Sequence, residues 1–215
     1  MATLLLRIEA PMQSWGVSSL FTERDTAREP SKSGVIGLIC AALGRSRTAD
    51  LTDLSVLRMG VRVDREGSVE KDFQTAREIM KADGSKPKKG ETVTSERYYL
   101  ADAVFLVGLE GPPELLQQIQ KAFKNPIWAL FFGRKAFPPS KPVFLEDGLR
   151  KGELISELCG YPLLRGRGVK NCRLVLESEE GEFRRQDNPI NFAERKFKSR
   201  MIQIQISPCG RKEEA

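Results

Sequence analysis

One segment that is apolar on both flanks constrains the fold of this chain more than any other feature. In residues 35–43, apolar side chains recur at 35, 38, 39 and 42, the spacing of one helix face, and positions 36, 40 and 43 make the other flank apolar as well. Ser31 or Ser33 is suited to cap the start of this helix, and Gly44 to end it. The pattern therefore predicts a buried helix at the centre of the fold.

Strands are predicted before and after this helix. Alternating apolar residues predict strands at 4–8, 59–63 and 202–206, and a run that is apolar on both faces predicts a central strand at 104–109. A second helix is expected at 113–123. This order of elements is typical of an α+β fold, a ferredoxin-like sandwich, with one long insertion.

The insertion, residues 66–100, is polar and basic and carries lysines at positions 81, 86, 88 and 89 near its middle. We interpret it as a long β-hairpin. The alternative is a disordered surface loop without a function. Roughly 35 residues is long for a passive connection in a compact domain, which favours a functional hairpin.

Composition excludes several classes of protein. The chain has 215 residues, 40% of them hydrophobic and 30% charged, which suits one globular domain. No apolar run approaches the roughly 20 residues that cross a bilayer, and the N-terminus lacks a basic leader, so we expect a cytoplasmic protein. The four cysteines have no C-x-x-C spacing and there is no histidine, so neither a metal site nor a disulfide framework is expected.

Charge and local sequence point to a polyanionic partner. The net charge is +6, and residues 125–215 hold 17 Lys and Arg against 12 Asp and Glu. Arg24, Arg28 and Lys32 lead up to the start of the buried helix, where backbone N–H groups favour anions. Ser33 and Gly34 follow at once, and Gly34 would let a phosphate approach the backbone. Helix capping alone is the alternative interpretation; a P-loop is excluded because its motif is absent.

A second basic motif lies at residues 133–139. Arg134 and Lys135 stand beside Phe137 in a turn-rich segment, where base stacking and phosphate pairing can coexist. A solvated turn above a buried Phe137 explains the motif equally well. Basic runs at 165–173 and 195–200 are candidates to extend this basic RNA-binding surface. The alternative is that they are only solvated surface residues. Trp15 is a candidate for base stacking, although a tryptophan after a strand more often closes a core.

No active site is visible in the sequence. Histidine, the commonest general acid or base near pH 7, is absent. Tyr98, Tyr99, Tyr161 and the lysines remain as substitutes, and no spacing of acids predicts paired metal ligands. We therefore expect a binding protein without a cofactor or a small-molecule substrate.

Three blocks carry a resemblance to a known family. They are residues 8–16 (IEAPMQSWG), residues 24–44 with PSKSGVIG at 30–37, and residues 132–138 (FGRKAFP). In this order and separation they resemble the CasD family, the handle-binding RAMP subunit of the type I-E CRISPR Cascade complex. The resemblance covers about residues 3–145.

The resemblance implies an RRM-like RAMP domain over residues 1–215, with a thumb at 66–100 and a C-terminal extension at about 146–215. It implies binding of the crRNA 5′ handle in antiviral defence, with the Cascade backbone subunit and large subunit as protein partners and no membrane. The resemblance and the local chemistry together predict these RNA-binding residues: Gln13, Trp15, Arg24, Arg28, Lys32, Ser33, Gly34, Arg97, Arg134, Lys135 and Phe137.

Two alternatives remain open. Handle-processing relatives in another CRISPR subtype cut RNA with a tyrosine, a lysine and a histidine, and this chain lacks the histidine. A metal-independent RNA endonuclease that uses Tyr98 or Tyr99 with a lysine is therefore disfavoured but is retained. The other alternative is a protein-interaction scaffold whose basic charge is incidental, which predicts no salt-sensitive RNA affinity.

Overall fold

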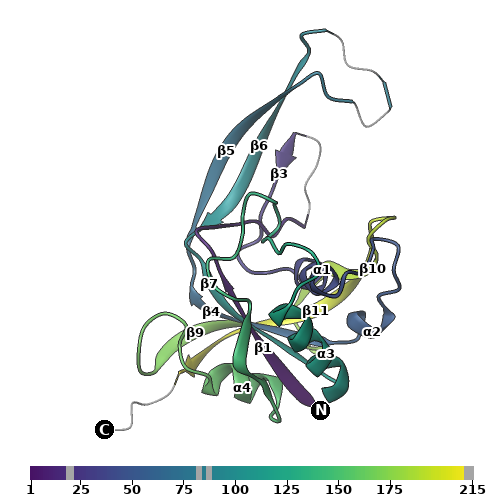
Figure 1. Cartoon of the computed structure of the whole chain (residues 1–215). Coiled ribbons are helices and arrows are strands. Elements are labelled where there is room, and N and C mark those ends of the chain that lie inside the picture. The colour runs from purple at the N-terminus through teal and green to yellow at the C-terminus, as the bar shows by residue number, and fades with distance from the viewer. Residues whose placement is uncertain (18–21, 81–83, 86–88, 211–215) are drawn as a thin grey trace.

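The computed structural model describes residues 1–17, 22–80, 84–85 and 89–210. The expected basic hairpin tip falls partly outside this range, since the lysines at 81, 86 and 88 are not among the described residues. The described chain forms a mixed α+β structure with a large antiparallel sheet and a smaller second sheet (Figure 1). None of its described helices is long and apolar enough to cross a bilayer.

The larger sheet has the strand order β10-β11-β9-β4-β7-β1-β8. Each pair of neighbours in it is antiparallel. The strands are β1 (Ala2–Glu9), β4 (Arg58–Arg65), β7 (Val104–Gly111), β8 (Phe144–Arg150), β9 (Lys170–Glu177), β10 (Phe183–Asn191) and β11 (Lys196–Cys209). The strands expected at 4–8, 59–63, 104–109 and 202–206 thus all lie in one sheet.

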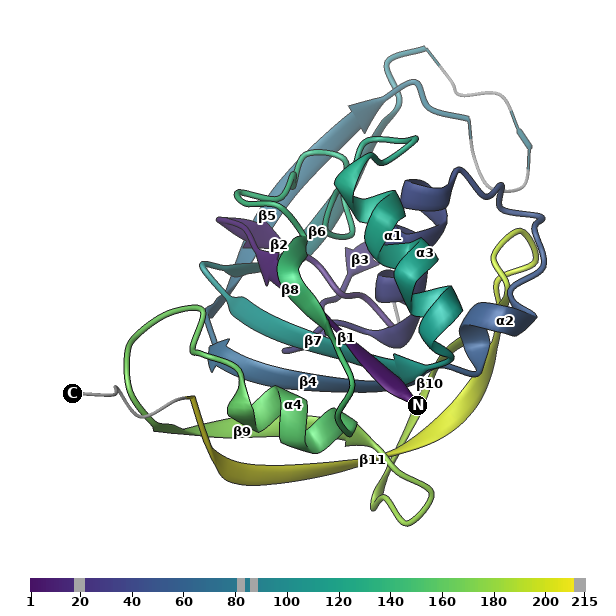
Figure 2. The same cartoon turned by 60° about the horizontal axis from the view of Figure 1, so that its bottom comes forward.

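Helices cover both faces of this sheet (Figure 2). They are α1 (Lys32–Leu43), α2 (Thr52–Ser55), α3 (Pro113–Lys124) and α4 (Leu154–Gly160). One face of β1, with Leu4 and Leu6, packs in the main core with α1 and α3, whereas Leu5 faces the second core under α4. The centre of the sheet is therefore buried on both sides, which explains why the segment 104–109 is apolar at every position.

Helix α1 forms as its sequence predicts. Ser31 is the N-cap, and its Oγ accepts a hydrogen bond from the Gly34 N–H at 3.3 Å. Gly44 ends the helix in the left-handed conformation, with φ of 69°. Val35 and Ile39 are fully buried, which confirms the expectation of a largely buried helix.

The smaller sheet carries the insertion. Its strands are β2 (Met12–Gln13), β3 (Glu23–Arg24), β5 (Ser68–Arg77) and β6 (Thr92–Ala101). Strands β5 and β6 pair antiparallel from the Ser68–Ala101 pair to the Arg77–Thr92 pair and form the long hairpin that projects from the main sheet in Figure 1. Strand β3 runs parallel to β6 and places Arg24 next to Arg97. The pairing of β3 with β6 thus attaches the basic loop before α1 to the hairpin.

The C-terminal strands continue the main sheet. Strand β9 pairs with β4, and β11 pairs with β9 in register from Ile202–Glu177 to Cys209–Lys170. Val175 and Ile202 lie in the main core together with α1. Residues 170–209 therefore share the sheet and the core of the N-terminal part.

Candidate nucleic-acid interface

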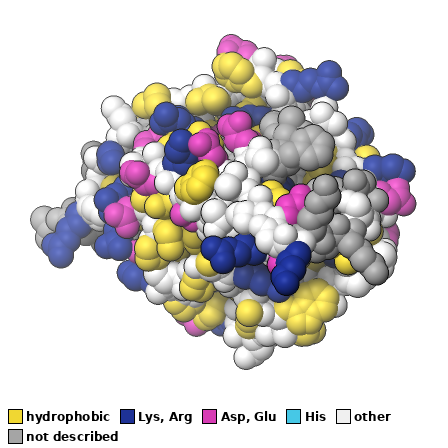
Figure 3. Space-filling model, turned by 90° about the horizontal axis from the view of Figure 1, so that it is seen from above, with side chains coloured by type: hydrophobic (Ala, Val, Ile, Leu, Met, Phe, Trp, Pro, Cys, Tyr) yellow, Lys and Arg dark blue, Asp and Glu magenta, His cyan; other side chains and the backbone are white. Residues whose placement is uncertain are grey.

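A cleft of about 600 Å³ opens where the two sheets meet the start of α1. Its walls come from the segment after β2, strand β3, the first turn of α1, strand β6, the turn at Gly133 and the β10–β11 turn. In the view from above, Lys and Arg side chains gather near the middle of the molecule (Figure 3). The arginines that line the cleft are Arg24, Arg47, Arg97, Arg134 and Arg195; Asp25 also lines it.

Five of the predicted RNA-binding residues line this cleft with accessible surface. They are Arg24, Ser33, Gly34, Arg97 and Arg134. The pairing of β3 with β6 explains part of the gathering, because it sets two of the arginines side by side. The sequence separates these residues by as much as 110 positions, and the two sheets bring them together.

Arg134 is held in place by a glycine turn. Gly133 has a φ of 85°, and a Cβ atom there would overlap the carbonyl oxygen of Ser14, so only glycine fits. The Arg134 Nη2 donates a hydrogen bond to the Tyr98 carbonyl at 2.7 Å, and its guanidinium lies 5.4 Å from the centre of the Phe137 ring. The Arg134 Nη1 is buried and has no hydrogen-bond acceptor within the described residues.

The arginines of the cleft repel one another. Burial lowers the pKa of the Arg134 guanidinium, and the nearby charges of Arg97 and Arg24 lower it further, against an opposing effect of Asp72. An arginine still stays protonated at neutral pH. An anion that enters the cleft would relieve this repulsion and accept hydrogen bonds from the guanidinium N–H groups. The arrangement therefore favours a phosphate-bearing ligand.

Gln13 and Trp15 are corrections to the predicted site, because both side chains are buried. The Gln13 Nε2 donates to the Ala103 carbonyl at 2.7 Å, and its Oε1 accepts from the Trp15 Nε1 at 3.2 Å. Trp15 is only 2% exposed and packs beside the Phe132 ring. A Cβ at Gly34 would lie 2.8 Å from the indole. Gly34 therefore makes room for Trp15 rather than for a phosphate, and Trp15 closes the core beneath the cleft.

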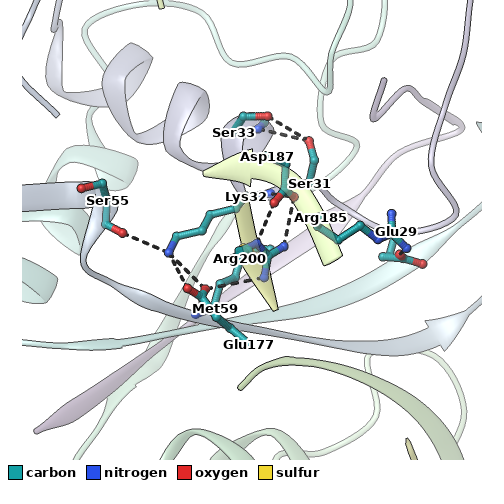
Figure 4. A network of polar contacts seen from close by, with 11 residues as sticks. Glu29, Ser31, Lys32, Ser33, Ser55, Met59, Glu177, Arg185, Asp187 and Arg200 are labelled. Atoms are coloured by element: carbon teal, nitrogen blue, oxygen red, sulfur yellow. Dashed lines mark hydrogen bonds and ion pairs between the residues drawn. The ribbon is translucent and has the colours of Figure 1, made fainter. Parts of the chain in front are cut away.

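Lys32 is a second correction. Its side chain is 1% exposed, and its Nζ forms an ion pair with Glu177 at 2.9 Å and donates to the Ser55 carbonyl at 3.0 Å (Figure 4). Burial lowers the pKa of this lysine, and the charge of Glu177 opposes the shift. The Lys32 backbone N–H donates to Asp187 at 2.8 Å. A carboxylate of the chain itself thus occupies part of the helix start that was expected to bind phosphate.

The remaining predicted residues lie outside the cleft. Phe137 is 7% exposed and packs against the Tyr99 ring with 5.8 Å between centroids, so it is not available for base stacking. Lys135 and Arg28 are exposed but do not line the cleft. The charge of Arg28 acts on Glu66 instead.

Arg47, Phe192, Arg195 and Phe197 also line the cleft and were not among the predicted RNA-binding residues. The basic run at 195–200 was the available signal for two of them, but other basic residues of the C-terminal third serve the fold. Arg173 pairs with Glu29 and Glu66, and Arg200 pairs with Asp187. No sequence signal indicated Arg47 as a binding residue, because it is a single arginine in the polar connection between α1 and α2.

Comparisons with known proteins agree with the sequence motifs. Residues 3–205 match the family model of the CRISPR-associated protein Cas5. The chain is 35% identical over 159 residues to the CRISPR system Cascade subunit CasD of Escherichia coli strain K12, which covers 66% of this chain and 69% of that protein.

Two solved structures share the fold. One, described as a crystal structure of a Cas protein, is 43% identical and superposes with a TM-score of 0.81, covering 99% of this chain and 98% of that one. The other belongs to a CRISPR RNA-guided surveillance complex and is 33% identical, with a TM-score of 0.81 over 96% of this chain and 90% of that one. The chain therefore belongs to the Cas5 family of CRISPR-associated proteins.

Proposed function

We propose that this chain is a crRNA-binding subunit of a type I-E Cascade surveillance complex, where it caps the 5′ handle of the RNA. The arginine cleft carries the proposal. Five guanidinium groups and one carboxylate line one opening. Each guanidinium group presents N–H donors that match phosphate oxygens. The relatives named for Cascade and for an RNA-guided complex support the same ligand.

The fold suits this role. The elements β1, α1, β4, β7, α3 and β8 follow one another along the chain, and the strands among them lie in the sheet order β4-β7-β1-β8. We infer that this is a ferredoxin-like, RRM-like arrangement. Residues 1–215 then form a single RAMP domain, with the β5–β6 hairpin as its thumb. The shared sheet and core of residues 170–209 support one domain rather than two.

The protein partners in this proposal are the Cascade backbone subunit and the large subunit. Exposed apolar side chains on and beside the β5–β6 hairpin support a protein contact there: Phe73 is 61% exposed, Met80 is 74% exposed and Val69 is 43% exposed. The RNA cleft lies at the base of this hairpin, since Arg97 belongs to β6. A partner bound to the hairpin would therefore stand next to the RNA.

The proposal includes no catalytic step. The lysine opposite Tyr98 in the hairpin is Lys71, whose ammonium donates to Glu96 at 3.2 Å, and this hydrogen bond raises its pKa. A lysine held in its protonated form is a poor general base. The Tyr98 hydroxyl lies 3.5 Å from the same carboxylate. These contacts favour binding over the alternative of a metal-independent endonuclease.

RNA affinity of cleft variants tests the proposal. A double variant, Arg97→Ala with Arg134→Ala, should bind repeat-derived single-stranded RNA more weakly, and its log–log salt slope should be shallower by about 1.4, at roughly 0.7 per lost phosphate contact. Lys151→Ala, which removes one exposed charge outside the cleft, should leave the slope unchanged. Fluorescence anisotropy at several salt concentrations measures both. Equal slopes for all proteins would remove the cleft from the RNA site, and loss of full-length RNA during incubation would favour the endonuclease.

A further inference from the structure

The turn between β10 and β11 forms a wall of the arginine cleft. Phe192 and Arg195 lie in this turn, Phe197 follows at the start of β11, and all three line the cleft. In the sequence, this turn is distant both from the loop before α1 and from the turn at Gly133. This wall of the cleft thus lies outside the three sequence blocks that carry the family resemblance.

The turn is fixed to the body of the protein. The Arg47 Nη2 donates to the Phe192 carbonyl at 2.9 Å, and the Ala193 N–H donates to the Arg47 carbonyl at 3.1 Å. The Phe192 ring packs against the main core, and its Cζ lies 3.9 Å from where a Cβ would stand at Gly37 in α1. Contacts with α1 and with the segment after it therefore hold the turn in place without any ligand, so this wall is pre-organised.

Arg195 adopts a backbone conformation that is uncommon for a residue with a side chain. Its φ is 53°, in the left-handed region. Such conformations cluster at functional sites, where the surrounding structure holds them in place. Arg195 is exposed, and within the described residues neither Arg195 nor Arg47 forms an ion pair with an acid. Both charges remain available to a ligand in the cleft.

Phe197 supplies an apolar surface beside these charges. Its ring meets the Phe192 ring edge to face, with centroids 6.5 Å apart and an angle of 67°. Phe192 packs on the core, whereas Phe197 is half-buried and lines the cleft. An aromatic ring among arginines is the combination that binds an unstacked base together with its phosphates.

We propose that the β10–β11 turn forms a subsite for one unstacked nucleobase of the bound RNA, which rests on the proposed function of the cleft. Phe197 stacks on the base, and Arg195 and Arg47 contact the phosphates on either side of it. The cleft volume of about 600 Å³ suits a small number of nucleotides taken into a pocket better than a strand lying on an open surface.

A base-by-base comparison of RNA probes tests the subsite. The full chain is titrated with repeat-derived single-stranded RNA and with a series of probes in which one nucleotide at a time is abasic. Wild type should lose about tenfold in affinity at one position, the scale expected for one stacked base. Phe197→Ala should bind the intact probe about tenfold more weakly, and removal of that base should then cost nothing further. Phe197→Leu keeps an apolar side chain without a ring and should lose the same base-specific effect while preserving the fold.

Charge variants complete the test. Arg195→Ala should make the salt slope shallower by about 0.7. Lys198→Ala removes an exposed cation of strand β11 outside the cleft and should not change the slope. An abasic scan that is identical in wild type and Phe197→Ala overturns the subsite. If Arg97→Ala with Arg134→Ala still weakens binding in that case, the proposed function stands without the subsite; if it does not, both fail.

Discussion

Two lysines that look alike in the sequence have opposite surroundings in the structure. Lys32 and Lys135 both stand in basic motifs, yet the Lys32 ammonium is buried against Glu177 and Lys135 is exposed. The ion pair with Glu177 offsets the cost of burying the Lys32 charge. Lys32 therefore stabilises the fold, and it ties α1 to the end of β9.

This difference predicts opposite responses to the same substitution. Lys32→Met should lower the free energy of unfolding by about 3 kcal/mol, because Glu177 would keep a partly buried charge and lose its closest cation. Lys135→Met should change it by less than about 0.5 kcal/mol, as is usual for an exposed side chain. Urea denaturation of both variants measures the difference. Equal stabilities would contradict the assignment of Lys32 to the ion network.

At the scale of elements, the start of α1 depends on a carboxylate from β10. Asp187 accepts hydrogen bonds from the Lys32 N–H at 2.8 Å and from the Arg200 Nε at 2.7 Å. Burial acts to raise the pKa of Asp187, but the hydrogen bond and charge of Arg200, together with the Lys32 N–H, outweigh it and lower the pKa below the ordinary value of 3.8. The ionised carboxylate is thus the form that links the helix to the C-terminal strands.

The lowered pKa predicts a loss of stability in acid. In the unfolded chain Asp187 takes up a proton at a higher pH than in the folded chain, so its contribution is complete above about pH 3.8 and is lost as the pH falls through the folded-state value. Asp187→Asn should therefore be less stable than wild type at pH 7 and approach it at pH 3. Denaturation from pH 7 to pH 3 checks this.

Asp53→Asn is the control, since Asp53 has a lowered pKa but pairs with Arg45 on the surface. It should converge with wild type in the same direction by a much smaller amount, because exposed ion pairs contribute little. A constant gap between Asp187→Asn and wild type across this pH range would show that the charge of Asp187 does not support α1.

Local patterns predicted the elements well. Helix α1 and strands β1, β4 and β7 follow from side-chain spacing, capping and continuous apolar runs, which depend only on neighbouring residues. Long-range contacts were not predictable in the same way. Nothing near Lys32 in the sequence indicates that it contacts Asp187 and Glu177, which lie in strands about 150 residues later.

For the accessible arginines, RNA binding stays a prediction, whereas several other motif residues are buried and serve packing. Arg24, Arg97 and Arg134 meet in the cleft, whereas Gln13, Trp15 and Phe137 are buried beside or beneath it. A motif alone does not separate residues that contact a ligand from residues that hold the contacting ones in position. Arg47 and Arg195 were not among the predicted binding residues: Arg47 is a single arginine in the α1–α2 connection, and Arg195 belongs to a basic run that is equally typical of a solvated surface.

At the scale of the whole molecule, the C-terminal strands support the cleft from two sides. The ion network of Glu177, Asp187 and Arg200 holds the first turn of α1, and the β10–β11 turn forms one wall of the cleft. The β5–β6 hairpin stands on the same face and contributes Arg97. One cleft thus joins the N-terminal loop, the hairpin and the C-terminal third, which explains why its residues are spread over the whole sequence.

Cross-linking of the purified complex can locate the bound RNA on the surface of this chain. The complex is isolated from cells that express this chain with its partner subunits and a CRISPR repeat, and the bound RNA is cross-linked by ultraviolet light. Mass spectrometry of the cross-linked peptides, with sequencing of the RNA ends, identifies the contacts. If RNA binds in the arginine cleft, a uniform repeat-derived 5′ end should be cross-linked to peptides that contain Arg97, Gly133 to Arg134, or Arg195 to Phe197. Cross-links confined to peptides outside the cleft, or RNA without a uniform repeat-derived 5′ end, would contradict the proposed function.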